Sequence, residues 1–289
     1  MLMTPGPTEV PERVRNAMSL PIQNPDIDED FFEFYHALED KLKGVYQTED
    51  DVLILGGEGI LGLEASVAST ISKGDKVLCI SNGIYGEGFA DFVDMYGGES
   101  VLYEVPYGSR IDLDGVKGVL EDEDFKAATM VHCETPTGTL NRIDPILSVL
   151  QDEGVLTIVD AVSSLGGTNV PVNKIDICIG GSQKCFSAPP GLATLSVSED
   201  AWDTIMQKDQ RTHYCNLAMW KEMWLEDEYF PYTHSVSNLY AFNEALNLIL
   251  EEGLENVFER HEKSADKCRD MAFDMGLPLF PEDEELSSP

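Results

Sequence analysis

A lysine and an aspartate have the residue types and positions from which a chemical function can be inferred. Lys184 lies in the segment 181–185, GSQKC, and Asp160 follows the apolar segment 155–159. A lysine between apolar strands is poorly placed as a solvated charge, and an aspartate that ends a buried strand needs a cation to face. Together they predict a pyridoxal site, in which the lysine amine forms a Schiff base and the carboxylate keeps the pyridine nitrogen protonated. Taken singly, the aspartate is also typical of a helix cap and the lysine of a solvent-facing side chain.

Short apolar segments alternate with helical patterns along most of the chain. The segment 51–55 ends in a glycine-rich turn, helical spacing follows over 60–71, and the segment 76–80 is the next predicted strand. Four further strands are predicted, at 128–132, 155–159, 175–179 and 192–197. Near-continuous apolar strands separated by helices predict an α/β fold with a largely parallel sheet covered on both faces.

The ends of these predicted strands carry the polar candidates. Ligands of parallel α/β sheets bind at the carboxyl ends of the strands. Gly57, residues 133–137, Asp160 and Lys184 all fall at such ends. The sequence therefore predicts that four strand ends converge on one crevice.

Length and composition indicate a soluble enzyme. The 289 residues suffice for one large domain and part of a second. No apolar stretch approaches the roughly 20 residues of a transmembrane helix, and the proline-rich start has no signal-peptide core, so we expect a cytoplasmic location. Six scattered cysteines without metal-ligand spacing favour reduced thiols and no structural metal.

Acidic residues dominate the charge. The chain has 19 basic and 53 acidic residues, a net charge of −34. Such a surface repels nucleic acid and anionic membranes, and it repels itself unless salt screens it. The acids are spread along the chain, as in 26–30 and 121–124, so we interpret them as solvated faces adapted to a salt-rich cytoplasm. A calcium site is the alternative, but neither run has the glycine-containing loop of an EF-hand.

Three motifs resemble the alanine–glyoxylate/serine–pyruvate branch of the class V aminotransferases. They are, in the family's order, residues 3–8 (MTPGPT), 160–167 (DAVSSLGG) and 181–192 (GSQKCFSAPPGL). The resemblance runs from residue 1 to about residue 275. It implies the three-layer large domain of a fold-type I enzyme, pyridoxal 5′-phosphate as cofactor, and amino transfer from alanine or serine to glyoxylate or pyruvate. Cysteine desulfurases share the fold class, but a histidine normally precedes their lysine, where this chain has Gln183.

The resemblance also assigns roles to single residues. Lys184 is expected to hold the cofactor and to move the substrate proton, and Asp160 to pair with the pyridine nitrogen. Tyr85 matches the aromatic position stacked on the ring, Thr135 a hydroxyl near the ring oxygen, and Gln183 a position near the phosphate arm. Tyr85 has a second interpretation as an ordinary core tyrosine, and Thr135 as a residue that only shapes the turn before a proline.

The neighbouring subunit is also implied. Thr233 matches a position that the family donates to the site of the other subunit. The expected active unit is therefore a homodimer.

The glycine-rich turn departs from the family pattern. Gly57, Glu58 and Gly59 stand where the family has small and polar phosphate donors, while Ile60 and Phe230 replace two further polar groups. The turn's amides still favour an anion, but the Glu58 carboxylate would occupy their site. Two like charges about 4 Å apart repel by about 4 kcal/mol at an effective dielectric of about 20. The pattern resembles pyridoxamine–pyruvate transaminases, which use the unphosphorylated vitamer as a substrate; the alternative is that Glu58 faces solvent and phosphate binds the backbone alone.

The regular alternation of predicted strands and helices ends at about residue 200. Residues 200–229 hold all three tryptophans and are interpreted as an excursion near a subunit boundary. We expect three parts, namely an N-terminal arm (1–20), a large cofactor-binding domain (21–245), and a linking helix with the start of a truncated C-terminal domain (246–289).

The resemblance implies a C-terminal domain that carries a substrate-binding arginine, and the 289 residues are either a fragment of a longer protein or a truncated relative. A catalytically silent relative that keeps the fold is therefore a third hypothesis. The intact pair of Lys184 and Asp160 argues against it.

Added salt should stabilise the protein well beyond physiological ionic strength. Self-repulsion at a net charge of −34 is screened as the salt concentration rises, so the midpoint of thermal unfolding should climb between low and molar potassium chloride. Thermal melts across that series measure it. A midpoint that stays level or falls would mean that the acidic surface is no adaptation to salt.

Overall fold

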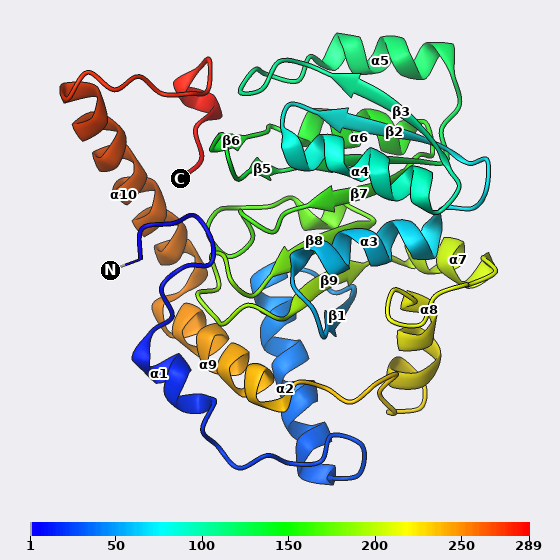
Figure 1. The fold of residues 1–289 in the computed structure, drawn as a ribbon, viewed down its shortest axis with the longest axis vertical. Coiled ribbons are helices and arrows are strands. Elements are labelled where there is room, and N and C mark those ends of the chain that lie inside the picture. The colour runs from blue at the N-terminus through cyan, green and yellow to red at the C-terminus, as the bar shows by residue number, and fades with distance from the viewer. Residues whose placement is uncertain (1) are drawn as a thin grey trace.

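A seven-stranded sheet forms the centre of the molecule. The computed structural model describes residues 2–289 (Figure 1), and the sheet has the strand order β1-β9-β8-β7-β4-β2-β3. Its strands are β1 (Asp51–Leu55), β2 (Lys76–Ser81), β3 (Glu99–Glu104), β4 (Ala127–Val131), β7 (Leu156–Asp160), β8 (Ile177–Gly181) and β9 (Ala193–Val197). A small hairpin of β5 (Cys133–Glu134) and β6 (Thr139–Leu140) follows β4.

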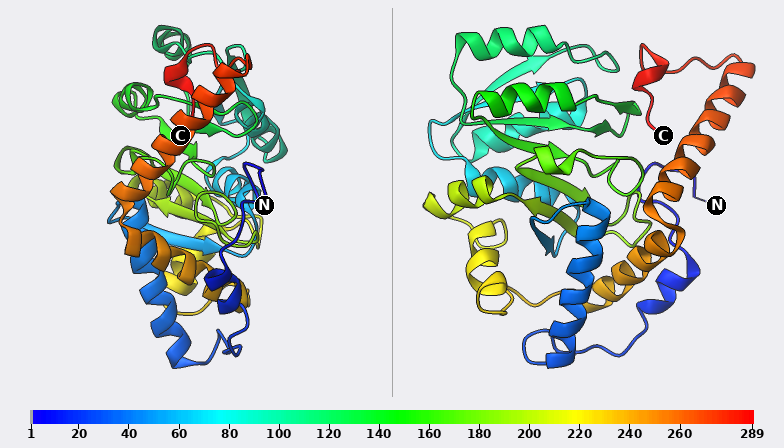
Figure 2. Two further views of the ribbon diagram at one scale, coloured as in Figure 1. Left: turned by 90° about the vertical axis from the view of Figure 1, so that its left-hand side faces the viewer. Right: turned by 180° about the vertical axis from the view of Figure 1, so that it is seen from behind.

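Helices cover both faces of the sheet, which confirms the predicted three-layer α/β architecture. In Figures 1 and 2, α3 and α4 lie on one face while α2 and α6 lie on the other. The α-helices are α1 (Glu12–Ala17), α2 (Glu29–Tyr46), α3 (Gly59–Thr70), α4 (Ile84–Met95), α5 (Leu113–Asp122), α6 (Asp144–Asp152), α7 (Glu199–Gln207), α8 (Leu217–Met219), α9 (Val236–Glu252) and α10 (Leu254–Asp274). Within residues 2–289, no helix is both long enough and apolar enough to cross a membrane.

The sheet is parallel except at β9, which runs antiparallel to both of its neighbours. Parallel neighbours need a long crossover, usually through a helix, whereas antiparallel neighbours need only a turn. The chain returns from β8 into β9 through residues 182–192, which contain no helix, so β9 must run backwards. The segment between these two strands carries Lys184.

Burial explains which strands the sequence reveals. Every residue of β4, β7, β8 and β9 is buried, in keeping with the near-continuous apolar segments that predict them. The strand β3 lies at the edge of the sheet, bonded only to β2, and its residues are exposed or half-buried. A pattern of continuous apolar residues therefore does not predict this strand.

The tryptophans expected near a subunit boundary pack largely inside the chain. Trp220 and Trp224 are fully buried, and the Trp224 ring stacks on Phe230 with ring centres 4.2 Å apart. The Trp224 indole also donates a hydrogen bond to Glu39 of α2 at 2.7 Å. This aromatic cluster joins the excursion to α2, and whether the excursion also borders a second subunit stays a prediction.

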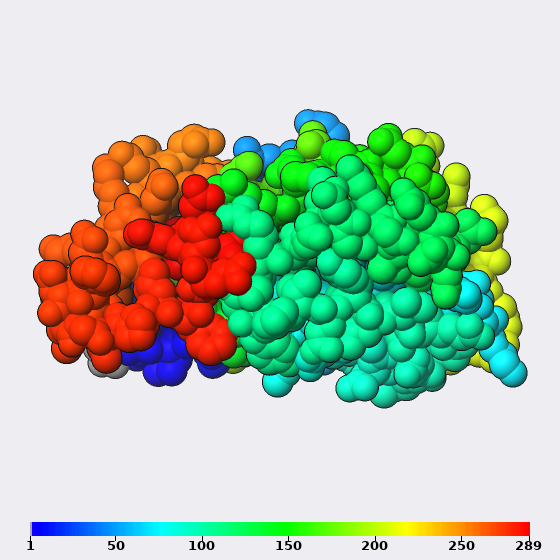
Figure 3. Space-filling model, turned by 90° about the horizontal axis from the view of Figure 1, so that it is seen from above, coloured from blue at the N-terminus to red at the C-terminus, as the bar shows by residue number. Residues whose placement is uncertain are grey.

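Both ends of the chain pack against the large sheet domain. In the N-terminal arm, the Thr8 amide donates to the Gln183 carbonyl and its hydroxyl to the Lys184 carbonyl, each at 3.0 Å. The C-terminal segment lies against the region that follows β3, where the Glu282 amide donates to the Gly108 carbonyl (Figure 3). Helix α9 runs through the expected boundary at residues 245 and 246, and the division into three parts stays a prediction.

Candidate active site

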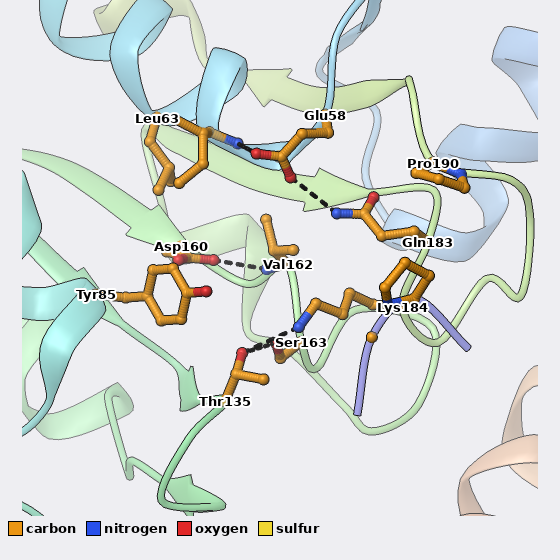
Figure 4. Close-up of a pocket in the computed structure, with 14 residues that line it drawn as sticks. Glu58, Leu63, Tyr85, Thr135, Asp160, Val162, Ser163, Gln183, Lys184 and Pro190 are labelled. Atoms are coloured by element: carbon orange, nitrogen blue, oxygen red, sulfur yellow. Dashed lines mark hydrogen bonds between the residues drawn. The ribbon is translucent and has the colours of Figure 1, made fainter. Parts of the chain in front are cut away.

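The carboxyl ends of the parallel strands enclose a cavity of about 290 Å³ (Figure 4). Segments that follow β1, β7 and β8 reach it, together with the hairpin after β4, the first turn of α4 and the N-terminal arm. Seven of the predicted site residues line it: Glu58, Gly59, Tyr85, Thr135, Asp160, Gln183 and Lys184. The predicted convergence of strand ends is thus present in the structure.

Lys184 reaches the cavity from the loop between β8 and β9. Its side chain is 9% exposed, and its ammonium group donates to the Thr135 hydroxyl at 3.2 Å. Gly6 lies directly against the lysine stem, where a Cβ would meet its Cδ at 2.5 Å. Burial lowers the pKa of the amine below its ordinary value, and the nearby Asp160 carboxylate opposes this shift. A lowered pKa increases the neutral, nucleophilic fraction of the amine.

Asp160 ends β7 at the floor of the same cavity. It is 5% exposed, and the Val162 amide donates to Oδ1 at 2.8 Å. Within residues 2–289, that amide is the one group that hydrogen-bonds to the carboxylate. Burial raises the pKa of Asp160 to about 7, and the Val162 amide opposes the rise only in part. The carboxylate therefore has an unfilled capacity to accept a proton or a hydrogen bond from a cationic partner.

These two residues fit a pyridoxal group. Asp160 offers a buried acceptor to a protonated ring nitrogen, and Lys184 offers an amine to an aldehyde. A buried carboxylate facing a cation is also the arrangement that removes the penalty of its own burial. The residues present thus match the two ends of the cofactor's reactive system.

Tyr85 and Thr135 stand on the hairpin side of the cavity. Tyr85 belongs to the first turn of α4, is partly buried and lines the cavity. The Thr135 hydroxyl bonds to the Ser163 hydroxyl as well as to Lys184. Thr135 thus does more than shape the turn before Pro136.

Glu58 is turned into the glycine-rich turn. As the N-cap of α3, it accepts from the Ile60 amide at 3.2 Å through one oxygen. Its other oxygen accepts from the Gln183 side-chain amide at 2.9 Å. The side chain is exposed overall, yet both of its oxygens are bonded to groups that surround the expected anion position. The carboxylate therefore bonds to two donors that an anion at this turn would also use.

The two glycines beside Glu58 allow close packing. A Cβ at Gly59 would lie 2.9 Å from a methyl group of Val162, and one at Gly57 would overlap the Leu61 side chain. Gly59 lines the cavity, while Gly57 bonds back to the Leu55 carbonyl at the end of β1.

Thr233 lies outside the cavity of its own chain, in the loop before α9. The neighbouring Tyr232 approaches the turn from behind, and its hydroxyl accepts from the Gly56 amide at 3.0 Å. Phe230 is buried in the aromatic cluster. The assignment of Thr233 to the site of a second subunit stays a prediction.

Several residues in or beside the site were given no individual role from the sequence. Gly6, Val162 and Ser163 line the cavity. They lie inside the motifs 3–8 and 160–167, and those motifs were the only indication in the sequence that these residues belong to the site. Glu134 is fully buried beside Thr135 and bonds to the first turn of α4. No periodicity in the sequence indicates that contact, because it joins two elements far apart along the chain.

Comparisons with known proteins show which family the chain belongs to. The family described as aminotransferase class-V matches residues 4–273. An uncharacterised aminotransferase of Methanocaldococcus jannaschii is 44% identical over 99% of this chain and 75% of its own length. Pyridoxamine–pyruvate transaminase of Mesorhizobium japonicum is 37% identical over 91% of this chain and 68% of its own.

A solved structure extends the agreement to three dimensions. The ureidoglycine–glyoxylate aminotransferase of Bacillus subtilis superposes with a TM-score of 0.94 at 33% identity, covering 99% of this chain and 74% of its own. Family, relatives and structure agree, and the chain belongs to the class V aminotransferases, a family of pyridoxal-dependent enzymes.

Proposed function

We propose that this protein transfers an amino group from a small amino acid to a small 2-oxo acid through a pyridoxal cofactor attached to Lys184. The observation that carries the proposal is the meeting of Lys184 and Asp160 in one cavity, where each is buried and, among residues 2–289, each side chain bonds to a single group. When bound, the cofactor supplies an aldehyde that reacts with amines and a ring that takes up electrons.

The roles of the residues follow from their contacts. Asp160 holds a proton on the ring nitrogen, because the buried carboxylate is stabilised by a cation. Lys184 acts as the base that moves the proton at the substrate carbon, since burial favours its neutral form. Thr135 orients the amine through its hydroxyl, and Tyr85 offers a flat ring that excludes water from one side.

The substrates are proposed from the relatives. The names of two similar proteins contain glyoxylate and pyruvate, which are both small 2-oxo acids. We therefore propose glyoxylate or pyruvate as acceptor and alanine or serine as donor, in a homodimer to which Thr233 contributes across the subunit boundary. A cytoplasmic location accompanies this proposal.

A second function is favoured by the position of Glu58. Its carboxylate bonds to both the Ile60 amide and Gln183, where a phosphate would need donors. This supports transamination between unphosphorylated pyridoxamine and pyruvate, the activity in the name of a relative at 37% identity. In that case the vitamer is a substrate.

Replacing Lys184 by alanine should abolish covalent attachment of the cofactor. The unmodified protein mixed with pyridoxal or pyridoxal phosphate should develop a visible absorption band, and borohydride should fix the cofactor on Lys184 in peptide mapping. The matched control is Lys208→Ala, which removes another lysine whose pKa burial lowers, and it should keep the band. Attachment to another lysine would refute the role of Lys184.

Asp160→Asn should preserve the visible band but slow transamination by at least about tenfold, the effect of 1.4 kcal/mol in the barrier. The amide can still accept from Val162, yet it cannot hold a proton on the ring nitrogen by its charge. Single-turnover rates for half-transamination measure the change. An unaltered rate would remove Asp160 from the chemistry.

Glu58→Ser should strengthen binding of pyridoxal phosphate relative to pyridoxal by at least about tenfold, because a repulsion of 1.4 kcal/mol gives that ratio. Titrations of each vitamer with each protein measure it, and Glu58→Gln separates the effect of charge from that of length. If the unmodified protein binds the phosphorylated form tightly and the serine variant is no different, the ordinary cofactor-dependent function is favoured.

A further inference from the structure

The buried carboxylate of Glu134 has no cation to balance it. Glu134 is fully buried on β5, and within residues 2–289 no lysine, arginine or histidine forms an ion pair with it. Burial raises the pKa of this carboxyl above its ordinary value, while bonds from the Gly86 and Tyr85 amides oppose the rise. A charge in such a place needs a compensating source of positive potential.

The amino terminus of α4 supplies that potential. One oxygen of Glu134 accepts from the Gly86 amide at 2.7 Å, and the other accepts from the Tyr85 amide at 3.3 Å. The first amides of a helix have no partner inside the helix and carry its partial positive charge. Gly83 at the N-cap has no side chain to bond them. The cap therefore comes from Glu134, which lies 48 positions after Gly86 along the chain.

Gly83 makes room for this contact. A Cβ at Gly83 would overlap the carboxyl carbon of Glu134, although its backbone is extended and open to any residue. The glycine is thus required by the approach of the carboxylate and not by its own backbone angles.

The contact joins two elements of the cavity wall, the first turn of α4 and the β5–β6 hairpin. Tyr85 is bonded to Glu134 through its amide and lines the cavity with its ring. The next residue after Glu134 is Thr135, whose hydroxyl accepts from Lys184. One side chain therefore joins the backbone that carries the Tyr85 ring to the hairpin that carries the Thr135 hydroxyl.

We propose that Glu134 is a positioning residue, which holds the first turn of α4 so that the Tyr85 ring is in place for the pyridoxal ring. The inference rests on the proposed function of the cavity. Glu134 acts through Tyr85 and does not touch the reacting atoms.

The test combines Glu134→Gln with Tyr85→Ala. The glutamine keeps the size of the side chain but removes the charge and turns an N–H group toward a backbone N–H. Without any vitamer, the amides of Tyr85 and Gly86 should lose protection from hydrogen exchange. The dissociation constant of the vitamer that binds the unmodified protein more tightly should rise by about tenfold. In the Tyr85→Ala background, Glu134→Gln should add nothing, because the two substitutions remove one effect.

Two further variants complete the experiment. Asp91→Asn removes an exposed carboxylate from the same helix and should leave the affinity unchanged. Gly83→Ala should displace the Glu134 carboxylate and raise the dissociation constant of the vitamer in the same way. If the glutamine variant does not fold, this variant tests the proposal in its place.

The outcomes separate this inference from the proposed function. A normal visible band with unchanged affinity in Glu134→Gln overturns the positioning role alone. A loss that persists in full in the Tyr85→Ala background also overturns it, because Glu134 would then act by another route. If the unmodified protein binds neither vitamer, the proposed function fails and this inference fails with it.

Discussion

The rest of the site depends on two ionisable side chains, Lys184 and Asp160, that are buried in one cavity. Lys184 is bonded there to the Thr135 hydroxyl, and Asp160 to a single backbone amide. Neither arrangement compensates for burial, so the amine is shifted toward its neutral form and the carboxyl toward its protonated form. A pyridoxal group would relieve both at once, because it presents an aldehyde to the amine and a ring nitrogen to the carboxyl.

The scaffold serves this arrangement by bringing distant segments to one edge of the sheet. The antiparallel return into β9 gives Lys184 its loop, and the N-terminal arm is bonded to that loop through Thr8. The Glu134 carboxylate fastens α4 to the hairpin that carries Thr135. These are contacts between backbone and side chain across the fold, so the geometry of the cavity depends on elements that are far apart in sequence.

Local patterns predicted most of the sheet, and seven of the candidate site residues, most of them assigned by the family resemblance, line the cavity. Buried strands such as β4 and β7 are continuous apolar segments, and Lys184 and Asp160 stand in motifs of recognisable order. The edge strand β3 was not predicted, because its residues are exposed or half-buried and do not form a continuous apolar segment. No role could be predicted for Glu134, because its partners are backbone amides in the first turn of α4. No spacing along the chain indicates that contact. The bonds of Glu58 to Ile60 and Gln183 likewise required the structure, since a sequence does not state where a side chain points.

The most direct measurement follows the Asp160 carboxyl by infrared difference spectroscopy, with Asp160→Asn to identify its band. In the protein without vitamer, the carboxyl should titrate with a pKa of about 7 and be mainly protonated at about pH 6. Adding pyridoxal at that pH should convert it to carboxylate, because a cationic ring nitrogen lowers the pKa of its partner. A carboxyl band that the vitamer leaves unchanged would contradict the account.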